Sequence, residues 1–127
     1  MADNKAIVLD LFQRFGNGDT DGAAALLHPE FVSHNPAVAH DPATGSGKQA
    51  FLDFFDGPAG KAIIAAGADI RRTVAEDDLV VIHNRIAQPG RETAAVDIFR
   101  VHDELVAEHW DVVQPVPATA ANPHGML

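Results

Sequence analysis

The chain has 127 residues, of which 18 are Asp or Glu and 9 are Lys or Arg, so its formal net charge is −9. This acidic balance disfavours binding to nucleic acid or to an anionic membrane surface, because both depend on Lys and Arg to neutralise phosphate. Cysteine is absent, which excludes disulfides, zinc–thiolate sites and cysteine nucleophiles. With 46% hydrophobic residues and no apolar stretch of membrane-spanning length, we expect one globular domain over residues 1–127. The start of the chain has acids where a signal peptide has a basic flank, which indicates a cytoplasmic protein.

The first half of the chain is predicted to be mainly helical. Capping residues precede apolar repeats over residues 3–15, 19–27 and 46–66, the last interrupted at Gly57-Pro58. Between the second and third helices, residues 31–35 are typical of a short strand. Residues 36–47 are rich in Pro, Gly, Asp and Thr, and so predict a surface loop.

The second half has the alternating apolar pattern of strands. Four strands are predicted over residues 68–77, 79–88, 92–102 and 105–116, separated by short turns. Short connections imply an antiparallel meander. Because helices come first and strands last, we expect an α+β fold with the helices packed on one face of a sheet.

Apolar residues point to both faces of the predicted sheet. Val80 and Ile82 alternate with Leu79 and Val81, and the next strand shows the same two-sided pattern. A sheet that is apolar on both faces must be covered on both. We therefore expect a homodimer through the outer sheet face. The alternative is that the long helix and the C-terminal tail cover both faces of a monomer.

Several polar residues occupy positions where the pattern calls for apolar ones: Asn35, His83, Asp97, His109 and Asp111. Asp97 is the least expected, because Ala and Val precede it and Ile and Phe follow it. Burial disfavours the charged form of a carboxylic acid, which suits it to general acid or base chemistry near neutral pH. The alternative is a structural acid paired with Arg85 or Arg100.

The hairpin registers decide which residues share a face with Asp97. A three-residue loop Pro89-Gly90-Arg91 would place His83 directly opposite Asp97, whereas a two-residue loop would place them on opposite faces. A three-residue loop over 102–104 would place His109 opposite Asp97, with Asp111 on the same face. With both three-residue loops, four ionisable side chains converge.

Other familiar sites are not supported. The segment Gly45-Ser46-Gly47-Lys48 lacks the remaining residues of a phosphate-binding loop. Ser33 and Ser46 are the only serines, and neither lies in a nucleophile elbow, which disfavours a serine hydrolase. His34, His83 and His109 could contribute to a metal site, but no histidine spacing supports one, so we expect neither metal nor cofactor. Four further histidines read as solvated loop or turn residues: His28, His40, His102 and His124.

Four segments resemble the SnoaL-like polyketide cyclase family of the ketosteroid isomerase and nuclear transport factor 2-like superfamily: residues 32–36, 75–83, 96–101 and 108–115. The resemblance extends over nearly the whole chain. It implies a cone-shaped α+β fold in which a curved, mixed sheet wraps around the N-terminal helices. It also implies a deep apolar pocket, a homodimer, and a small apolar organic ligand.

By the same resemblance, Asp97 is the catalytic acid or base, and His83 and Asn35 line the pocket beside it as further catalytic residues. The spacing of His83 and Asp97 matches the family's arrangement. His109 and Asp111 match a His-Trp-Asp motif of a subgroup of small, mostly uncharacterised members. We expect substrate contacts from His34, His109, Asp111, Phe99 and Phe55. Glu104 departs from the family, whose members usually have a turn glycine there, and so does Leu105, where lysine is usual.

Three functions remain open. The first is a cofactor-independent acid/base enzyme that enolises an apolar carbonyl or polyketide-like substrate, leading to isomerisation, aldol cyclisation or retro-aldol cleavage. The second is water activation on an epoxide, which needs two carboxylates and an arginine between them. Strand parity places Arg100 away from Asp97, which disfavours this reading. The third is a non-catalytic ligand-binding or assembly module of the same fold.

Overall fold

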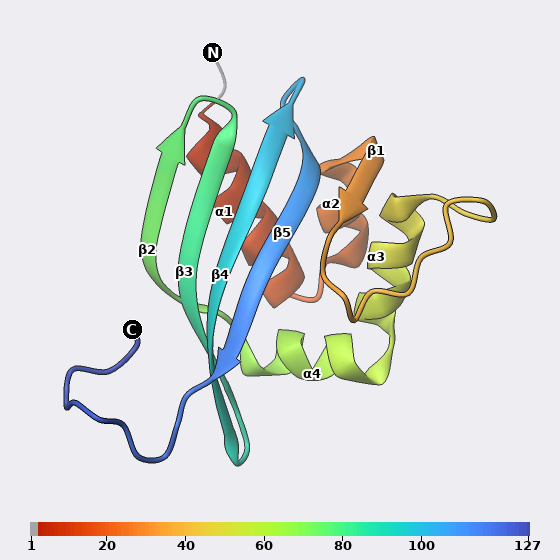
Figure 1. The fold of residues 1–127 in the computed structure, drawn as a ribbon. Coiled ribbons are helices and arrows are strands. Elements are labelled where there is room, and N and C mark those ends of the chain that lie inside the picture. The colour runs from red at the N-terminus through yellow and green to blue at the C-terminus, as the bar shows by residue number, and fades with distance from the viewer. Residues whose placement is uncertain (1–2) are drawn as a thin grey trace.

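A computed structural model describes residues 3–127 of the chain. It comprises helices α1 (Asn4–Gly16), α2 (Thr20–Ala25), α3 (Gly47–Asp56) and α4 (Pro58–Ala66), and strands β1 (Leu27–Ser33), β2 (Asp69–Glu76), β3 (Leu79–Gln88), β4 (Arg91–His102) and β5 (Leu105–Pro115). The strands form one sheet in the order β1-β5-β4-β3-β2 (Figure 1). This mixed α+β architecture with a curved sheet confirms the predicted fold class.

Local chemistry explains where the helices begin. The side chain of Asp3 accepts a hydrogen bond from the backbone N–H of Lys5, and Asp19 and Ser46 cap α2 and α3 in the same way. Pro58 occupies the first turn of α4, where its missing N–H costs nothing. These features confirm the predicted helix starts and the break at Gly57-Pro58.

Strand β1 differs from its predicted bounds. It begins at Leu27, four residues earlier than expected, and it contains Pro29. The strand lies at the edge of the sheet and runs parallel to β5, with an irregularity between Leu27 and Val32. An edge strand tolerates proline because one side of its backbone needs no ladder partner.

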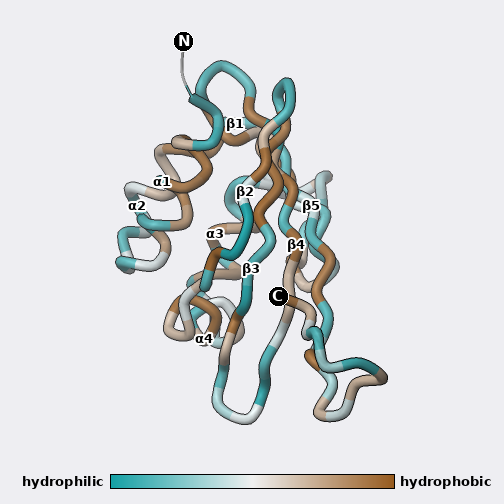
Figure 2. The backbone as a smooth tube through the Cα atoms, turned by 90° about the vertical axis from the view of Figure 1, so that its left-hand side faces the viewer, coloured by the Kyte–Doolittle hydropathy of each residue, from teal (hydrophilic) through white to brown (hydrophobic). Residues whose placement is uncertain are grey.

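All four helices lie on one side of the sheet (Figure 2). The hydrophobic core fills the space between this inner face and the helices. Its largest fully buried side chains are Val8, Leu11, Leu27, Phe31, Val80, Ile82 and Val106. The C-terminal segment after β5 lies on the other side of the sheet. Within residues 3–127, no helix is long and apolar enough to cross a membrane.

The first hairpin register is not the predicted one. Gln88 pairs with Arg91, so the loop contains only Pro89 and Gly90. Proline fixes its φ near −65°, and Gly90 has a φ of 71°, which together meet the needs of a two-residue turn. As a result Asp97 pairs with Ile82, and His83 lies on the opposite face of the sheet. The prediction that His83 faces Asp97 is therefore wrong.

The second hairpin places its side chains on the predicted faces of the sheet, although its turn is shorter than expected. Its turn has two residues, Asp103 and Glu104, both with positive φ (51° and 65°). A register shift follows between Arg100 and Val101, which leaves one extra residue in β5. The shift restores the parity that a three-residue loop would have given. Asp97, His109 and Asp111 thus share the inner face as predicted, although Asp97 pairs directly with Asp111 rather than with His109.

Candidate acid/base site

A cluster of polar side chains lies on the inner face of the sheet, where β3, β4, β5 and the end of β1 come together. Asn84, Asp97, His109 and Asp111 come from the three central strands, and Ser33 and Asn35 from the end of β1 and the loop after it. We call these six residues the inner polar cluster. The alternation of β4 alone brings Asp97 inward between Ala95 and Phe99, both of which are buried.

Asp97 accepts two hydrogen bonds from buried side chains. Nε2 of His109 lies 2.8 Å from Oδ1, and Nδ2 of Asn84 lies 2.8 Å from Oδ2. The side chain of Asp97 is 14% exposed and that of His109 is 6% exposed. Two donors at these distances fix the orientation of the Asp97 carboxyl group.

His109 is held between two polar partners and two aromatic rings. Its Nδ1 lies 2.9 Å from Oγ of Ser33, which itself accepts the backbone N–H of Asn35. In the tautomer that carries its proton on Nε2, His109 donates to Asp97 and accepts the hydroxyl proton of Ser33 at Nδ1. Phe99 stacks on the imidazole at 4.7 Å between ring centroids, and Phe51 meets it at 5.6 Å.

Asp111 carries a buried polar atom that makes no hydrogen bond. Nδ2 of Asn35 donates to its Oδ2 at 2.7 Å, while Oδ1 is buried and has no hydrogen-bond partner among residues 3–127. Burial raises the pKa of Asp111, and the nearby charge of Asp97 raises it further. The hydrogen bond from Asn35 and the nearby His109 act in the opposite direction and lower this pKa. A carboxyl group with this surrounding is disposed to carry a proton.

The arrangement can transfer protons between two unlike carboxyl groups. Both carboxyl oxygens of Asp97 accept hydrogen bonds, whereas Oδ1 of Asp111, on the residue directly opposite, is free to donate or accept one. Ligand atoms of Asp97, His109 and Asp111 also lie within 4.8 Å of one another, as in a metal site. However, both oxygens of Asp97 and both nitrogens of His109 are engaged in hydrogen bonds, so a metal ion would have to displace them. The donor set therefore favours proton transfer over metal binding.

The structure places two of the predicted site residues on the outer face, away from the cluster. His83 lies between Nη1 of Arg72 (3.0 Å) and the carbonyl of Met126 (2.9 Å). His34 pairs with Oε2 of Glu108 at 2.7 Å and stacks on Trp110. Both placements correct the expectation of a pocket role, and both follow from the period-2 alternation of the strands.

The remaining predicted residues lie in or near the cluster. Asn35 and Asp111 are hydrogen-bonded to each other, and Phe99 covers His109. Phe55 packs on Phe51, one ring further from His109, within the aromatic core.

Asn84 and Ser33 belong to the cluster although the sequence did not single them out. Asn84 is only 1% exposed, which is rare for an amide unless it is hydrogen-bonded. A three-residue loop after β3 would have turned His83, rather than its neighbour Asn84, toward Asp97. A two-residue Pro-Gly turn, read from the turn preferences of these residues, would have identified Asn84.

The arginines proposed for epoxide chemistry are engaged elsewhere. Arg100 pairs with Glu108 at 3.0 Å on the outer face, as its parity predicts. Arg85 pairs with Glu92 at 3.0 Å. Neither lies between Asp97 and Asp111.

Comparisons with known proteins agree with this fold. The SnoaL-like domain family matches residues 8–109, which is most of the chain. No curated protein matches the sequence significantly.

Solved structures with the same fold include three informative relatives. IdmH, a proposed polyketide cyclase from Streptomyces antibioticus, has a TM-score of 0.70 and 21% identity, covering 88% of this chain and 92% of its own. A proposed ketosteroid isomerase from Kribbella flavida has a TM-score of 0.72 and 18% identity, covering 96% and 83%. A protein of unknown function from Burkholderia xenovorans, similar to nuclear transport factor 2, has a TM-score of 0.71 and 17% identity, covering 93% and 88%. The chain belongs to the SnoaL-like domain family.

Proposed function

We propose that this protein is a cofactor-independent acid/base enzyme that enolises a small apolar carbonyl or polyketide-like compound. The observation that carries the proposal is the buried, unpartnered Oδ1 of Asp111 beside the hydrogen-bonded pair of Asp97 and His109. A buried polar atom without a partner is costly, and a substrate oxygen is a partner that would remove this cost. Family membership and the polyketide cyclase relative support the same class of chemistry.

The two carboxyl groups take complementary roles in this proposal. Asp97, ionised and oriented by His109 and Asn84, removes a proton from the carbon next to the substrate carbonyl. Asp111, protonated at Oδ1, donates to the carbonyl oxygen on which negative charge develops. The hydrogen bond from His109 stabilises the negative charge of Asp97, and the hydrogen bond to Ser33 fixes the orientation of the His109 ring. From the enolate, isomerisation, intramolecular aldol closure or retro-aldol cleavage can follow.

Enolisation can be tested without knowing the product. A panel of apolar cyclic ketones and β-diketones in D₂O is incubated with the protein, and loss of α-proton signals is followed by ¹H NMR. We expect catalysed exchange for at least one ketone, with Asp97→Asn and Asp111→Asn each reducing it by at least about tenfold. Glu108→Gln is the matched control, because it removes a carboxylate from the outer face of the same strand as Asp111.

Two results would contradict the proposal. Exchange at the wild-type rate in Asp97→Asn would remove Asp97 as the base. Tight binding of the same ketones without any exchange, in the wild type, would favour a non-catalytic ligand-binding module.

We also propose that the chain forms a homodimer through the outer sheet face. Two apolar rows cross this face from strand to strand, Val74–Val81–Ile98–Trp110 and the pair Val96–Val112. Val74 is 58% exposed and Val112 is 72% exposed. Exposed apolar rows of this kind are typical of association surfaces. Sedimentation at micromolar concentration should give twice the chain mass, shifted to monomer by Val112→Lys; a monomeric wild type would refute the dimer.

A further inference from the structure

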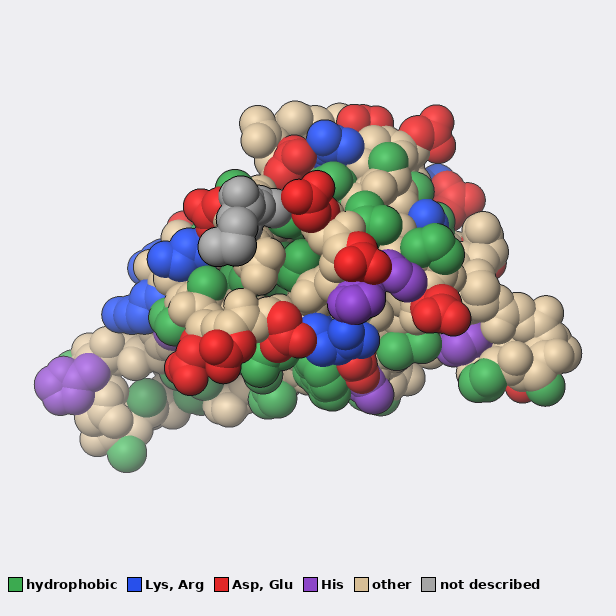
Figure 3. Space-filling view, turned by 90° about the horizontal axis from the view of Figure 1, so that it is seen from above, with side chains coloured by type: hydrophobic (Ala, Val, Ile, Leu, Met, Phe, Trp, Pro, Cys, Tyr) green, Lys and Arg blue, Asp and Glu red, His purple; other side chains and the backbone are tan. Residues whose placement is uncertain are grey.

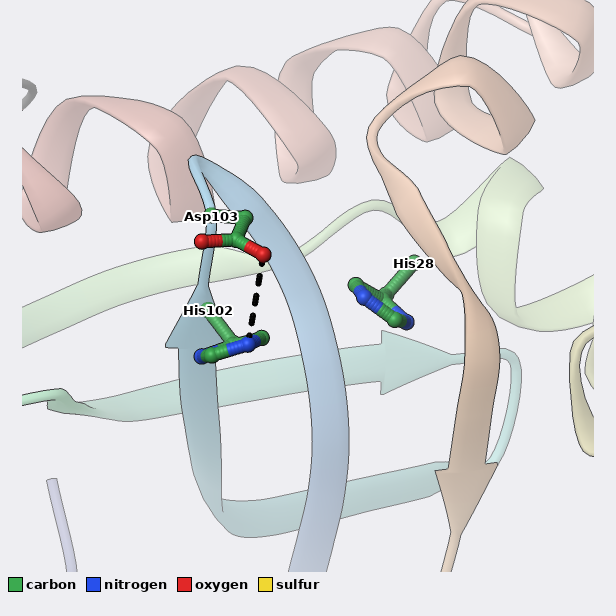
Figure 4. Close-up of side chains that lie close together, drawn as sticks. All are labelled: His28, His102 and Asp103. Carbon is green, nitrogen blue, oxygen red and sulfur yellow. Dashed lines mark ion pairs between the residues drawn. The ribbon is translucent and has the colours of Figure 1, made fainter.

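A second group of metal-ligating side chains lies at the upper end of the sheet, away from the inner polar cluster. His28 comes from the start of β1, His102 from the end of β4, and Asp103 from the β4–β5 turn (Figure 4). One ligand atom from each lies within 4.8 Å of the other two. The pairing of β1 with β5 brings these residues together, since Leu27 lies opposite Val106 in the sheet.

The distance between the ligand atoms of His102 and Asp103 already suits a metal ion. Nε2 of His102 and Oδ2 of Asp103 are 3.3 Å apart. In a tetrahedral Zn²⁺ site with bonds of about 2.0–2.1 Å, neighbouring ligand atoms lie about 3.3–3.4 Å apart. The imidazole of His28 lies beside that of His102, tilted by 54° to it, with 5.7 Å between the ring centroids. To complete three ligands, the side chain of His28 would have to turn a nitrogen toward the ion, with the fourth position open to water.

Two of the three side chains are free to adjust their positions, and acidic residues lie close to the group. The side chains of His102 and Asp103 are 59% and 77% exposed, so little packing restrains them. Figure 3 shows histidine side chains on the face seen from above, with both acidic and basic side chains around them. Glu30 and Glu104 lie within two residues of the ligands, whereas Lys48 is directed at the carbonyl of Leu27.

One hydrogen bond opposes metal binding and must be given up. Nδ1 of His28 accepts the backbone N–H of Glu30 at 3.1 Å, so the neutral ring carries its proton on Nε2. Binding through either nitrogen breaks this bond. Because Glu30 is exposed, water can replace histidine as the acceptor, and the cost stays small.

We propose that His28, His102 and Asp103 form a surface site for a divalent ion of the Zn²⁺ class, which ties the edge strand β1 to the β4–β5 turn. Two imidazoles and a carboxylate are ligands that Zn²⁺ accepts readily. The site is separate from the inner polar cluster and needs none of its residues. Its effect is to stabilise the edge strand that carries Ser33 at its other end.

The test is a titration of chelator-treated, tag-free protein with ZnCl₂ by calorimetry, together with thermal unfolding at each ZnCl₂ concentration. We expect one Zn²⁺ per chain and a rise in Tm with Zn²⁺, because an ion that binds only the folded state stabilises it. His28→Gln, His102→Gln and Asp103→Asn should each weaken binding by at least about tenfold. Asn is chosen at position 103 because it tolerates the positive φ there.

Controls separate this site from others on the chain. His40→Gln and His124→Gln remove exposed histidines elsewhere and should leave binding unchanged. Asp111→Asn, in the inner polar cluster, should also leave it unchanged. Binding that survives His28→Gln and His102→Gln but is lost in Asp111→Asn would overturn the proposal, as would no binding at millimolar ZnCl₂.

Discussion

Removal of the buried amide of Asn84 should be among the costliest changes in this protein. Its Nδ2 donates to a carboxylate oxygen of Asp97 at 2.8 Å, a charge-assisted bond worth about 1.5–3 kcal/mol. Asn84→Ala also leaves a cavity in a site that is 1% exposed, which adds about 1 kcal/mol. The total is about 3 kcal/mol. For 127 residues the unfolding entropy is about 0.27 kcal/mol/K, so Tm should fall by about 11 °C.

Thermal and urea unfolding followed by circular dichroism would measure this loss. Asn84→Leu keeps the volume but removes the donor, so it should retain most of the loss; full recovery would show that only the cavity mattered. Gln114→Ala removes an exposed amide and should change stability by less than about 0.5 kcal/mol. In a double-mutant cycle with Asp97→Ala, a coupling below about 0.5 kcal/mol would refute the assigned hydrogen bond.

Three further changes test other parts of the structure. The folded-state pKa of Asp111 is raised, so the contribution of this group to stability is lost as pH rises through that pKa. Asn cannot ionise. In urea unfolding, Asp111→Asn should therefore be more stable than the wild type at pH 7 and equal to it near pH 3. Glu104→Gly should raise stability by about 1 kcal/mol, because Glu104 has a φ of 65°; an unchanged Tm would contradict this. Gly60→Ala should lower it by about 2 kcal/mol, because a Cβ there meets the backbone of Phe54 and Phe55, and an unaffected urea midpoint would refute the close approach.

The parts of the fold predicted from sequence are those set by local chemistry. Asp3, Asp19 and Ser46 cap helices with their own side chains, so the helix starts could be read directly. The start of β1 could not, because its pairing with β5 joins residues far apart in sequence, across an irregular register. The clustering of His28 with His102 depends on the same long-range pairing.

The part of the candidate site that does not depend on strand register could be predicted from the sequence, and the part that depends on it could not. Asp97 stands out because a carboxylate in an apolar strand is rare, and that signal is independent of register. Whether His83 or Asn84 faces Asp97 depends on a single residue in the turn at Pro89-Gly90, since one residue reverses every side chain. His109 and Asp111 were placed correctly because a register shift compensated for the shorter turn.

A proton held by Asp111 is tested most directly by a ¹³C NMR titration of its side-chain carboxyl, assigned by comparison with Asp111→Asn. Its transition should lie above the ordinary Asp value of about 3.9, because burial disfavours the charge and Oδ1 has no donor. A transition at or below the ordinary value would contradict its role as the acid of the site.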